Sequence, residues 1–146
     1  LANSGNRYQA HLIKEVKDYS LKTTVEETPA NLLNTTGISA EVYDVVKKGM
    51  LSVTAEGTGS AVFSHYPIEV GGKTGTATIV EKGVEYDNGV FVAFAPYDNP
   101  EIAVSIVVEK GGHGSKLTPA AKEIFDAYFY YQGEAYIEQQ TGTLLQ

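Results

Sequence analysis

The sequence contains no cysteine and no tryptophan, and it has a single methionine. Without cysteine the chain can form no disulfide, use no thiolate in catalysis and hold no cysteine-ligated zinc. A chain free of thiols suits an oxidising compartment, where a free thiol is a liability. Long apolar runs are also missing, since none approaches the ~20 residues that a membrane-spanning helix needs.

Basic residues are scarce as well. The 146 residues include 11 lysines and arginines against 18 aspartates and glutamates, which gives a net charge of −7. Lys47-Lys48 is the largest basic cluster, so this balance argues against nucleic acid as a partner. Hydrophobic residues make up 42% of the chain and charged residues 20%. These proportions are those of a globular domain, or a piece of one, with a core of its own.

The first five residues, Leu1 to Gly5, resemble the last turn of a helix that Gly5 ends. The body of such a helix would lie outside this sequence, so we expect the chain to be the C-terminal part of a larger domain. That portion is expected to run over residues 1–131. The apolar pattern is lost after Tyr131, which predicts a loosely held tail over residues 132–146.

Hydrophobic spacing predicts the elements of the first half. Residues 8–25 suggest extended segments and a small hairpin, and residues 26–37 a loop. A helix is expected to begin after Ser39 as N-cap and to end near residues 57–59. The face that packs on a sheet is predicted from one apolar stripe, which consists of Val42, Val45, Val46, Met50 and Val53.

The second half predicts three strands and a helix. The strands are expected over residues 73–80, 89–96 and 102–108. Residues 81–88 are expected to form a polar connection, in which Gly83 could make a hairpin turn. The last two strands are apolar on both faces and closely joined, which predicts adjacent antiparallel central strands with both faces covered. Thr118 as N-cap and Pro119 announce the last helix, whose apolar stripe is Ala121, Ile124, Phe125, Tyr128 and Phe129. The expected fold class is α/β of the α+β type, an antiparallel β-sheet flanked by helices.

One glycine-rich stretch, Val70 to Ala77, compresses a lysine and two threonines between apolar flanks. A phosphate-binding loop would need a glycine five residues before Gly72. Pro67 occupies that position, and proline has no N–H to donate, so this reading fails. The alternative is Lys73-Thr74-Gly75, because Lys-Thr-Gly is a signature of penicillin-binding proteins and serine β-lactamases.

The chain resembles the C-terminal part of the transpeptidase domain of class B penicillin-binding proteins of the cell-elongation type. Four stretches carry the resemblance in the family's order: Leu1–Gly5 with Arg7-Tyr8 and His11-Leu12, Tyr66–Ile68 leading into Gly72–Ala77, Phe91–Pro96, and Glu109 with Gly111–Gly114. The fold that it implies is part of the transpeptidase fold shared with serine β-lactamases. Members use a serine to attack the D-alanyl-D-alanine of a peptidoglycan stem peptide, and β-lactams acylate the same serine.

The resemblance also implies roles for four residues. Lys73 would supply positive potential and help proton transfer, and the hydroxyls of Thr74 and Thr76 would receive the substrate carboxylate. The Thr76 N–H would be one oxyanion donor, and Gly75 would let the ligand approach the strand closely. No cofactor and no metal is implied. The full-length protein would be anchored in the bacterial cell membrane on its extracytoplasmic side, within a cell-wall synthesis complex.

The nucleophile is missing from the sequence. It belongs to a Ser-x-x-Lys motif, and no lysine here has a serine three residues before it. Ser4-Gly5-Asn6 matches the family's Ser-x-Asn signature only formally, because it falls in the helix-end segment. We therefore expect the substrate-binding half of the enzyme, inactive alone and partnered by the missing N-terminal part of the domain.

Two alternatives remain open at this point. The chain could be a fragment of a serine β-lactamase or β-lactam sensor, or a catalytically dead module that binds peptidoglycan or a partner. Two histidines are candidates for a functional role, His65 before the motif and His113 in the glycine-rich loop of residues 109–116. For both histidines, the sequence favours a position without catalytic function.

Overall fold

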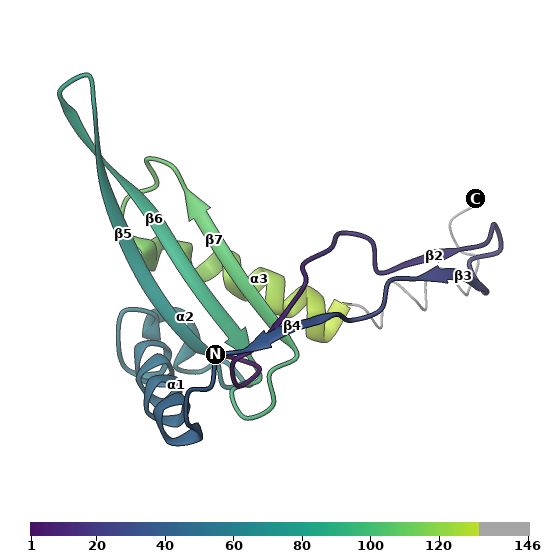
Figure 1. The fold of residues 1–146 in the computed structure, drawn as a ribbon. Helices are drawn as coiled ribbons and strands as arrows, with labels where there is room; N and C mark the ends of the chain where they lie inside the picture. The colour runs from purple at the N-terminus through teal and green to yellow at the C-terminus, as the bar shows by residue number, and fades with distance from the viewer. Residues whose placement is uncertain (132–146) are drawn as a thin grey trace. The chain divides into compact units, whose positions relative to one another are not determined.

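The computed structural model describes residues 1–131 (Figure 1). The chain divides into two compact units, Leu1–Tyr43 and Asp44–Gln146.

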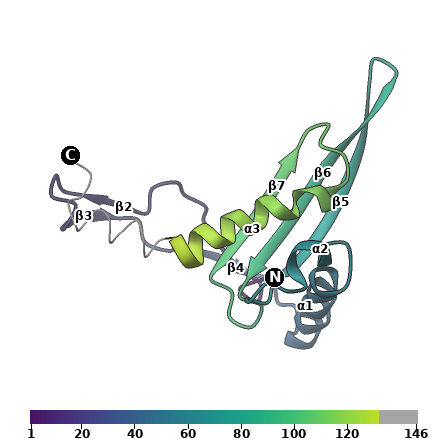
Figure 2. The same ribbon diagram turned by 180° about the vertical axis from the view of Figure 1, so that it is seen from behind.

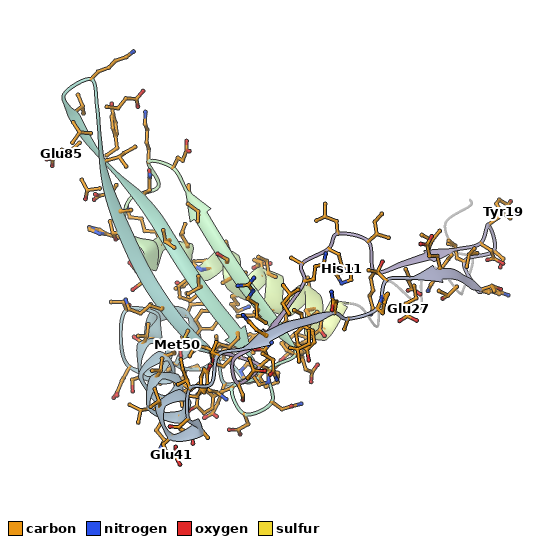
Figure 3. The ribbon with its side chains drawn as sticks, in the orientation of Figure 1. His11, Tyr19, Glu27, Glu41, Met50 and Glu85 are labelled. Atoms are coloured by element: carbon orange, nitrogen blue, oxygen red, sulfur yellow. The ribbon has the colours of Figure 1, made fainter. Side chains whose placement is uncertain are left out.

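The first unit contains two small antiparallel sheets. Strand β1 (Asn6–Tyr8) pairs with β4 (Leu32–Thr35), and β2 (Glu15–Lys17) pairs with β3 (Thr24–Glu27). The expected hairpin is present, and Tyr19 lies at its tip (Figure 3). Strand β4 lies where a loop was expected. Its partner β1 is distant in sequence, and local patterns carry no sign of such a pairing.

The N-terminal residues form a turn in which Ser4 N–H donates to Leu1 C=O at 3.2 Å, and Gly5 follows with φ of +83°. The Tyr43 and Thr36 hydroxyls share a hydrogen bond beside Gly5. A Cβ on Gly5 would lie 2.0 Å from the Tyr43 oxygen. Glycine is therefore required here both by its φ and by close packing.

Helix α1 (Ala40–Ala55) confirms the expected helix, but its packing face was predicted only in part, since Met50 is the one residue of the predicted stripe that is buried. The buried residues are Tyr43, Met50 and Thr54, whereas Val42 and Val45 of the predicted stripe are 52% and 71% exposed. The buried face includes the polar Thr54, whose hydroxyl bonds to the Val70 carbonyl. An apolar stripe alone could not identify a face that is anchored by a hydroxyl.

The second unit is built on one antiparallel sheet in the order β5-β6-β7. Its strands are β5 (Gly71–Glu81), β6 (Val84–Ala95) and β7 (Ile102–Val108). The hairpin turn considered at Gly83 is present between Glu81 and Val84, but residues 84–88 belong to β6 and not to a connection. Residues 84–88 pair with β5 in a hairpin that extends beyond β7, with Glu85 near its tip (Figure 3). Polar residues are tolerated there because this extension of the hairpin contributes no residue to the buried core.

One face of this sheet carries the core. Helix α3 (Thr118–Asp126) lies across it (Figures 1 and 2), and the short helix α2 (Ser60–Phe63) adds Phe63. The buried cluster consists of Phe63, Val70, Phe91, Ala93, Ala95, Leu117, Ala121 and Phe125. The opposite face is only partly covered, since Val107 is 62% exposed and Ala103 and Ser105 are exposed. The prediction of two covered faces is therefore not met within the described residues.

The start of α3 differs from expectation by one residue. Leu117 occupies the N-cap position without a side-chain cap, and Thr118 is the first helical residue. The Thr118 hydroxyl donates instead to the Ser115 carbonyl at 2.9 Å, within the 3₁₀ turn Gly114–Leu117. Ala121 and Phe125 of the predicted stripe are buried, and Ile124 is 40% exposed. A π-helical turn follows over Ala127–Tyr131.

The predicted tail, residues 132–146, lies outside the described residues. Within residues 1–131, no helix combines the length and apolar character needed to cross a membrane.

Candidate active site

Strand β5 lies at one end of the sheet order, so only one of its two edges pairs with a described strand. The Lys73 amine donates to the Thr74 carbonyl at 2.6 Å. The Thr74 carbonyl is therefore accessible from outside the sheet. Alternate residues of an antiparallel strand turn their N–H and C=O groups to opposite edges. Thr76 is thus expected to present its N–H at the same free edge as Thr74.

The pleat of β5 separates the motif into two faces. Thr74 pairs with Phe91 in the register and Thr76 with Gly89, which places both threonines on the face covered by α3. Lys73 and Gly75 point to the opposite face. Lys73 is exposed, and its amine forms no ion pair with any carboxylate of the described residues. Its positive charge is therefore available at the strand edge.

A polar cavity of about 200 Å³ opens beside the two threonines, lined by Thr58, Thr74, Gly75, Thr76, His113, Gly114 and Ser115. The Thr58 and Thr74 hydroxyl oxygens are 2.8 Å apart. The Thr76 hydroxyl oxygen lies 3.5 Å from His113 Nδ1. The cavity therefore offers several hydrogen-bond donors to an anionic ligand.

The glycine-rich loop reaches this cavity because Gly114 has no side chain. A Cβ there would lie 2.2 Å from the Val90 carbonyl oxygen and 2.3 Å from the Gly75 oxygen. The loop is also tied to the extension of β6, where Gly112 N–H donates to Asp87 C=O at 2.9 Å. These contacts hold His113 beside Thr76.

The three glycines of the motif, Gly71, Gly72 and Gly75, differ in how closely their surroundings pack. At Gly71 a Cβ would lie 2.4 Å from the Phe94 ring, and at Gly72 it would lie 2.9 Å from Thr54 Cγ2. Both are packing positions. At Gly75 a Cβ would lie 3.4 Å from Val90 Cβ, which is an ordinary contact. Packing within the sheet therefore does not require a glycine at position 75. The role predicted for Gly75, close approach of a ligand, stays a prediction.

A second, separate hollow of about 300 Å³ is lined by Val62, His65, Tyr66, Pro67, Lys122, Asp126 and Tyr130. Its centre is Asp126, which accepts from the Tyr66 hydroxyl at 2.9 Å and from Lys122 at 2.5 Å. The Lys122 hydrogen bond lowers the pKa of Asp126, and burial together with the Asp126 bond raises the pKa of Tyr66. This cluster fastens α3 to the segment before β5.

The two histidines have different surroundings. His113 contacts Thr76 in the β5 cavity, whereas His65 lines the second hollow and its Nδ1 lies 2.9 Å from the Ser64 hydroxyl oxygen. Sequence reasoning gave no role to Thr58 or Ser115, which line the β5 cavity. The glycines on either side of Thr58 were the only available signal. No group of three or more His, Asp or Glu side chains suited to a metal occurs within the described part of the chain.

Fold and site together define the class: an antiparallel sheet domain with helices on one face, whose lysine- and threonine-bearing end strand borders a polar cavity. The chain belongs to the family of the penicillin-binding protein transpeptidase domain, whose family model matches residues 1–128. This confirms the resemblance and the fold class that the sequence predicted.

Individual relatives agree with this membership. Peptidoglycan D,D-transpeptidase MrdA of Haemophilus influenzae is 31% identical over 143 residues, which cover 88% of this chain and 22% of that protein. Penicillin-binding protein 2B of Streptococcus pneumoniae has a similar structure, with a TM-score of 0.74 and 27% identity over 89% of this chain and 23% of that one. A chain of a solved peptidoglycan synthase complex gives a TM-score of 0.70 at 26% identity, covering 88% of this chain and 21% of that one. The chain thus spans about a fifth of the length of these relatives.

Proposed function

We propose that this chain is the substrate-binding half of a peptidoglycan D,D-transpeptidase, which cross-links stem peptides through a serine acyl-enzyme and binds penicillin. The observation that carries the proposal is the free edge of β5, where Lys73 and the carbonyl of Thr74 lie next to the threonine-lined cavity. An extended peptide can add to such an edge as a further strand, with its backbone hydrogen-bonded to β5. Family membership supports the same reaction class.

Each motif residue has a role in this proposal. The hydroxyls of Thr74 and Thr76 donate to the terminal carboxylate of D-alanyl-D-alanine, or to the carboxylate of a β-lactam. The Thr76 N–H stabilises the oxyanion that forms when the serine attacks the carbonyl carbon. Lys73 raises the positive potential at the strand edge and assists proton transfer to the leaving D-alanine. Gly75 keeps the strand surface open to the ligand.

The serine must come from outside this sequence, which contains no Ser-x-x-Lys. We propose that it is supplied by the N-terminal part of the same domain, packed beside β5. In the whole protein the serine attacks the peptide bond of D-alanyl-D-alanine, and D-alanine leaves as the acyl-enzyme forms. The amine of a neighbouring stem peptide then takes the acyl group, and the serine hydroxyl is released. The whole protein is proposed to be membrane-anchored, with this domain on the extracytoplasmic side, and to act within a cell-wall synthesis complex.

Labelling with a fluorescent penicillin tests this proposal. The 146-residue chain alone should show no covalent label, and stable labelling would contradict the missing nucleophile. The whole protein that carries this chain should label, and Lys73→Ala should slow its acylation at least ~100-fold, the range of a lost proton-transfer group. Lys82→Ala, in the hairpin turn beyond the site, is the matched control and should label at the unaltered rate.

Two rival functions predict other outcomes. A serine β-lactamase would release the label by rapid hydrolysis, whereas the transpeptidase acyl-enzyme should persist after free penicillin is removed. A catalytically dead binding module would bind stem peptide without any label in the whole protein. Unchanged labelling of Lys73→Ala would remove this lysine from the mechanism.

A further inference from the structure

The loop between α1 and α2 brings one more hydroxyl to the β5 cavity. Thr58 lies in this loop, and its Oγ1 is 2.8 Å from the Oγ1 of Thr74. Thr58 is exposed as a residue, yet its side chain lines the cavity and meets a residue of the recognition strand.

The loop is tightly fixed around Thr58. Gly57 N–H donates to the Ser52 carbonyl at 2.9 Å, and Gly59 N–H donates to the Val53 carbonyl at 2.8 Å. A Cβ on Gly57 would lie 2.9 Å from the Val53 Cα, and a Cβ on Gly59 would lie 3.2 Å from the Val53 oxygen. The two glycines therefore let the chain turn back closely against the end of α1, and Thr58 is held between them.

The end of α1 is in turn fixed to β5. The Thr54 hydroxyl bonds to the carbonyl of Val70, directly before the strand, and the Thr54 methyl group packs where a side chain on Gly72 would lie. Thr54 is only 2% exposed. Thr58 and Thr74 are thus carried by one packed unit, and their contact follows from that packing.

A hydroxyl has a single proton, so the direction of the Thr58–Thr74 hydrogen bond decides what Thr74 can do. If Thr74 donates to Thr58, it has no proton left for a carboxylate in the cavity. If Thr58 donates, the Thr74 oxygen is satisfied as an acceptor, and its own proton is free to bond to the ligand. An anionic ligand favours the second arrangement, because a donor facing a carboxylate is stabilised.

We propose that Thr58 is a positioning residue of the transpeptidase site, which donates to Thr74 and so directs the Thr74 hydroxyl proton toward the carboxylate of the substrate or β-lactam. This proposal rests on the proposed function, since it assigns the carboxylate to Thr74. It predicts that loss of the Thr58 hydroxyl slows acylation by ligands that carry a carboxylate and leaves acylation by ligands without one unchanged.

Acylation kinetics of the whole protein with benzylpenicillin and with its methyl ester test the proposal. For Thr58→Val, the second-order acylation rate with the free acid should fall about three- to tenfold, the effect of one hydrogen bond. The loss should appear mainly in the non-covalent binding constant rather than in the acylation step. The rate with the ester should change less than about twofold, because the ester offers no anionic acceptor to the Thr74 proton. Thr58→Ser keeps the hydroxyl and should restore the acid rate.

The ratio of the acid rate to the ester rate is independent of how much of a variant is correctly folded, so a partly unfolded Thr58→Val remains informative. Thr78→Val is the matched control, since its hydroxyl bonds to Asp87 at 2.7 Å and lies outside the cavity lining. An unchanged ratio in Thr58→Val, whether both rates fall equally or neither falls, overturns the role of Thr58.

Thr74→Val separates this failure from failure of the proposed function. If Thr74→Val lowers the acid-to-ester ratio and Thr58→Val does not, only the Thr58 proposal is wrong. If neither variant changes the ratio, the assignment of the carboxylate to Thr74 is wrong as well.

Discussion

Asp126 shows at the scale of one residue how charge holds this fold together. Asp126 is only 7% exposed, and its carboxylate accepts hydrogen bonds from both Tyr66 and Lys122. The Lys122 hydrogen bond lowers its pKa in the folded state. A carboxyl group with a lowered pKa adds stability above its unfolded pKa, and that stability is lost as the pH falls through the folded pKa.

Asp126→Asn should therefore lower the urea midpoint of the chain at pH 7, because the amide keeps an acceptor for Tyr66 and loses the charge opposite Lys122. At a pH below the folded pKa of Asp126, both proteins are neutral at this position and the difference in midpoint should largely vanish. Asp98→Asn, in the β6–β7 turn, is the control and should change little at either pH. An equal loss at both pH values would show that the charge is not what matters.

Phe125 and Ile124 are neighbours on α3 with opposite exposure, 0% and 40%. Phe125→Ala should reduce the free energy of unfolding by about 3–5 kcal/mol, because it empties the centre of the core cluster. Ile124→Ala should cost less than about 1 kcal/mol, since its side chain is already partly in water. Urea denaturation of the two variants measures both values, and similar losses would contradict the core as described.

At the scale of elements, the glycine-rich loop depends on its contact with β5 and β6. Gly114→Ala places a methyl group against two backbone oxygens, at 2.2 Å and 2.3 Å, which no side chain can relieve. We expect the loop to be displaced, with a loss of about 1–3 kcal/mol of stability and slower acylation in the whole protein.

Gly49→Ala is the matched control for this substitution. Gly49 lies in α1, and a Cβ there would meet nothing within 4 Å. Alanine is the better helix former, so this variant should gain about 0.5–1 kcal/mol. If Gly114→Ala behaved like Gly49→Ala in urea denaturation, the close approach of the loop to β5 would be wrong.

The elements also show what the sequence could predict and what it could not. The position of β5 and its motif could be predicted from the strand pattern of residues 73–80 and from Lys73-Thr74-Gly75, which are local signals. Strand β4 and the buried face of α1 were missed because each depends on a partner distant in sequence. Thr58 was missed for the same reason: its neighbour Thr74 is 16 residues away, and nothing in Gly57-Thr58-Gly59 identifies that neighbour.

At the scale of the whole molecule, the chain leaves much apolar surface in water. On α1 alone, Val42, Val45 and Val46 are 52%, 71% and 42% exposed. Surfaces of this kind bind hydrophobic dyes. The triple variant with threonine at these positions should bind less 8-anilinonaphthalenesulfonate than the parent chain, with little change in the unfolding midpoint. Undiminished dye binding would locate the apolar surface elsewhere.

The hydrogen bond from Lys73 to the Thr74 carbonyl also bears on aggregation. A strand with one unpaired edge is a template for any other extended chain, including a second copy of itself, and fibrous aggregates grow by such pairing. In the absence of ligand, the lysine amine occupies an acceptor at this edge and places a charge beside it. A cognate peptide with a terminal carboxylate can compensate that charge, but a second β5, with its own lysine, would add to it. We therefore expect the charge of Lys73 to disfavour pairing between two copies of β5.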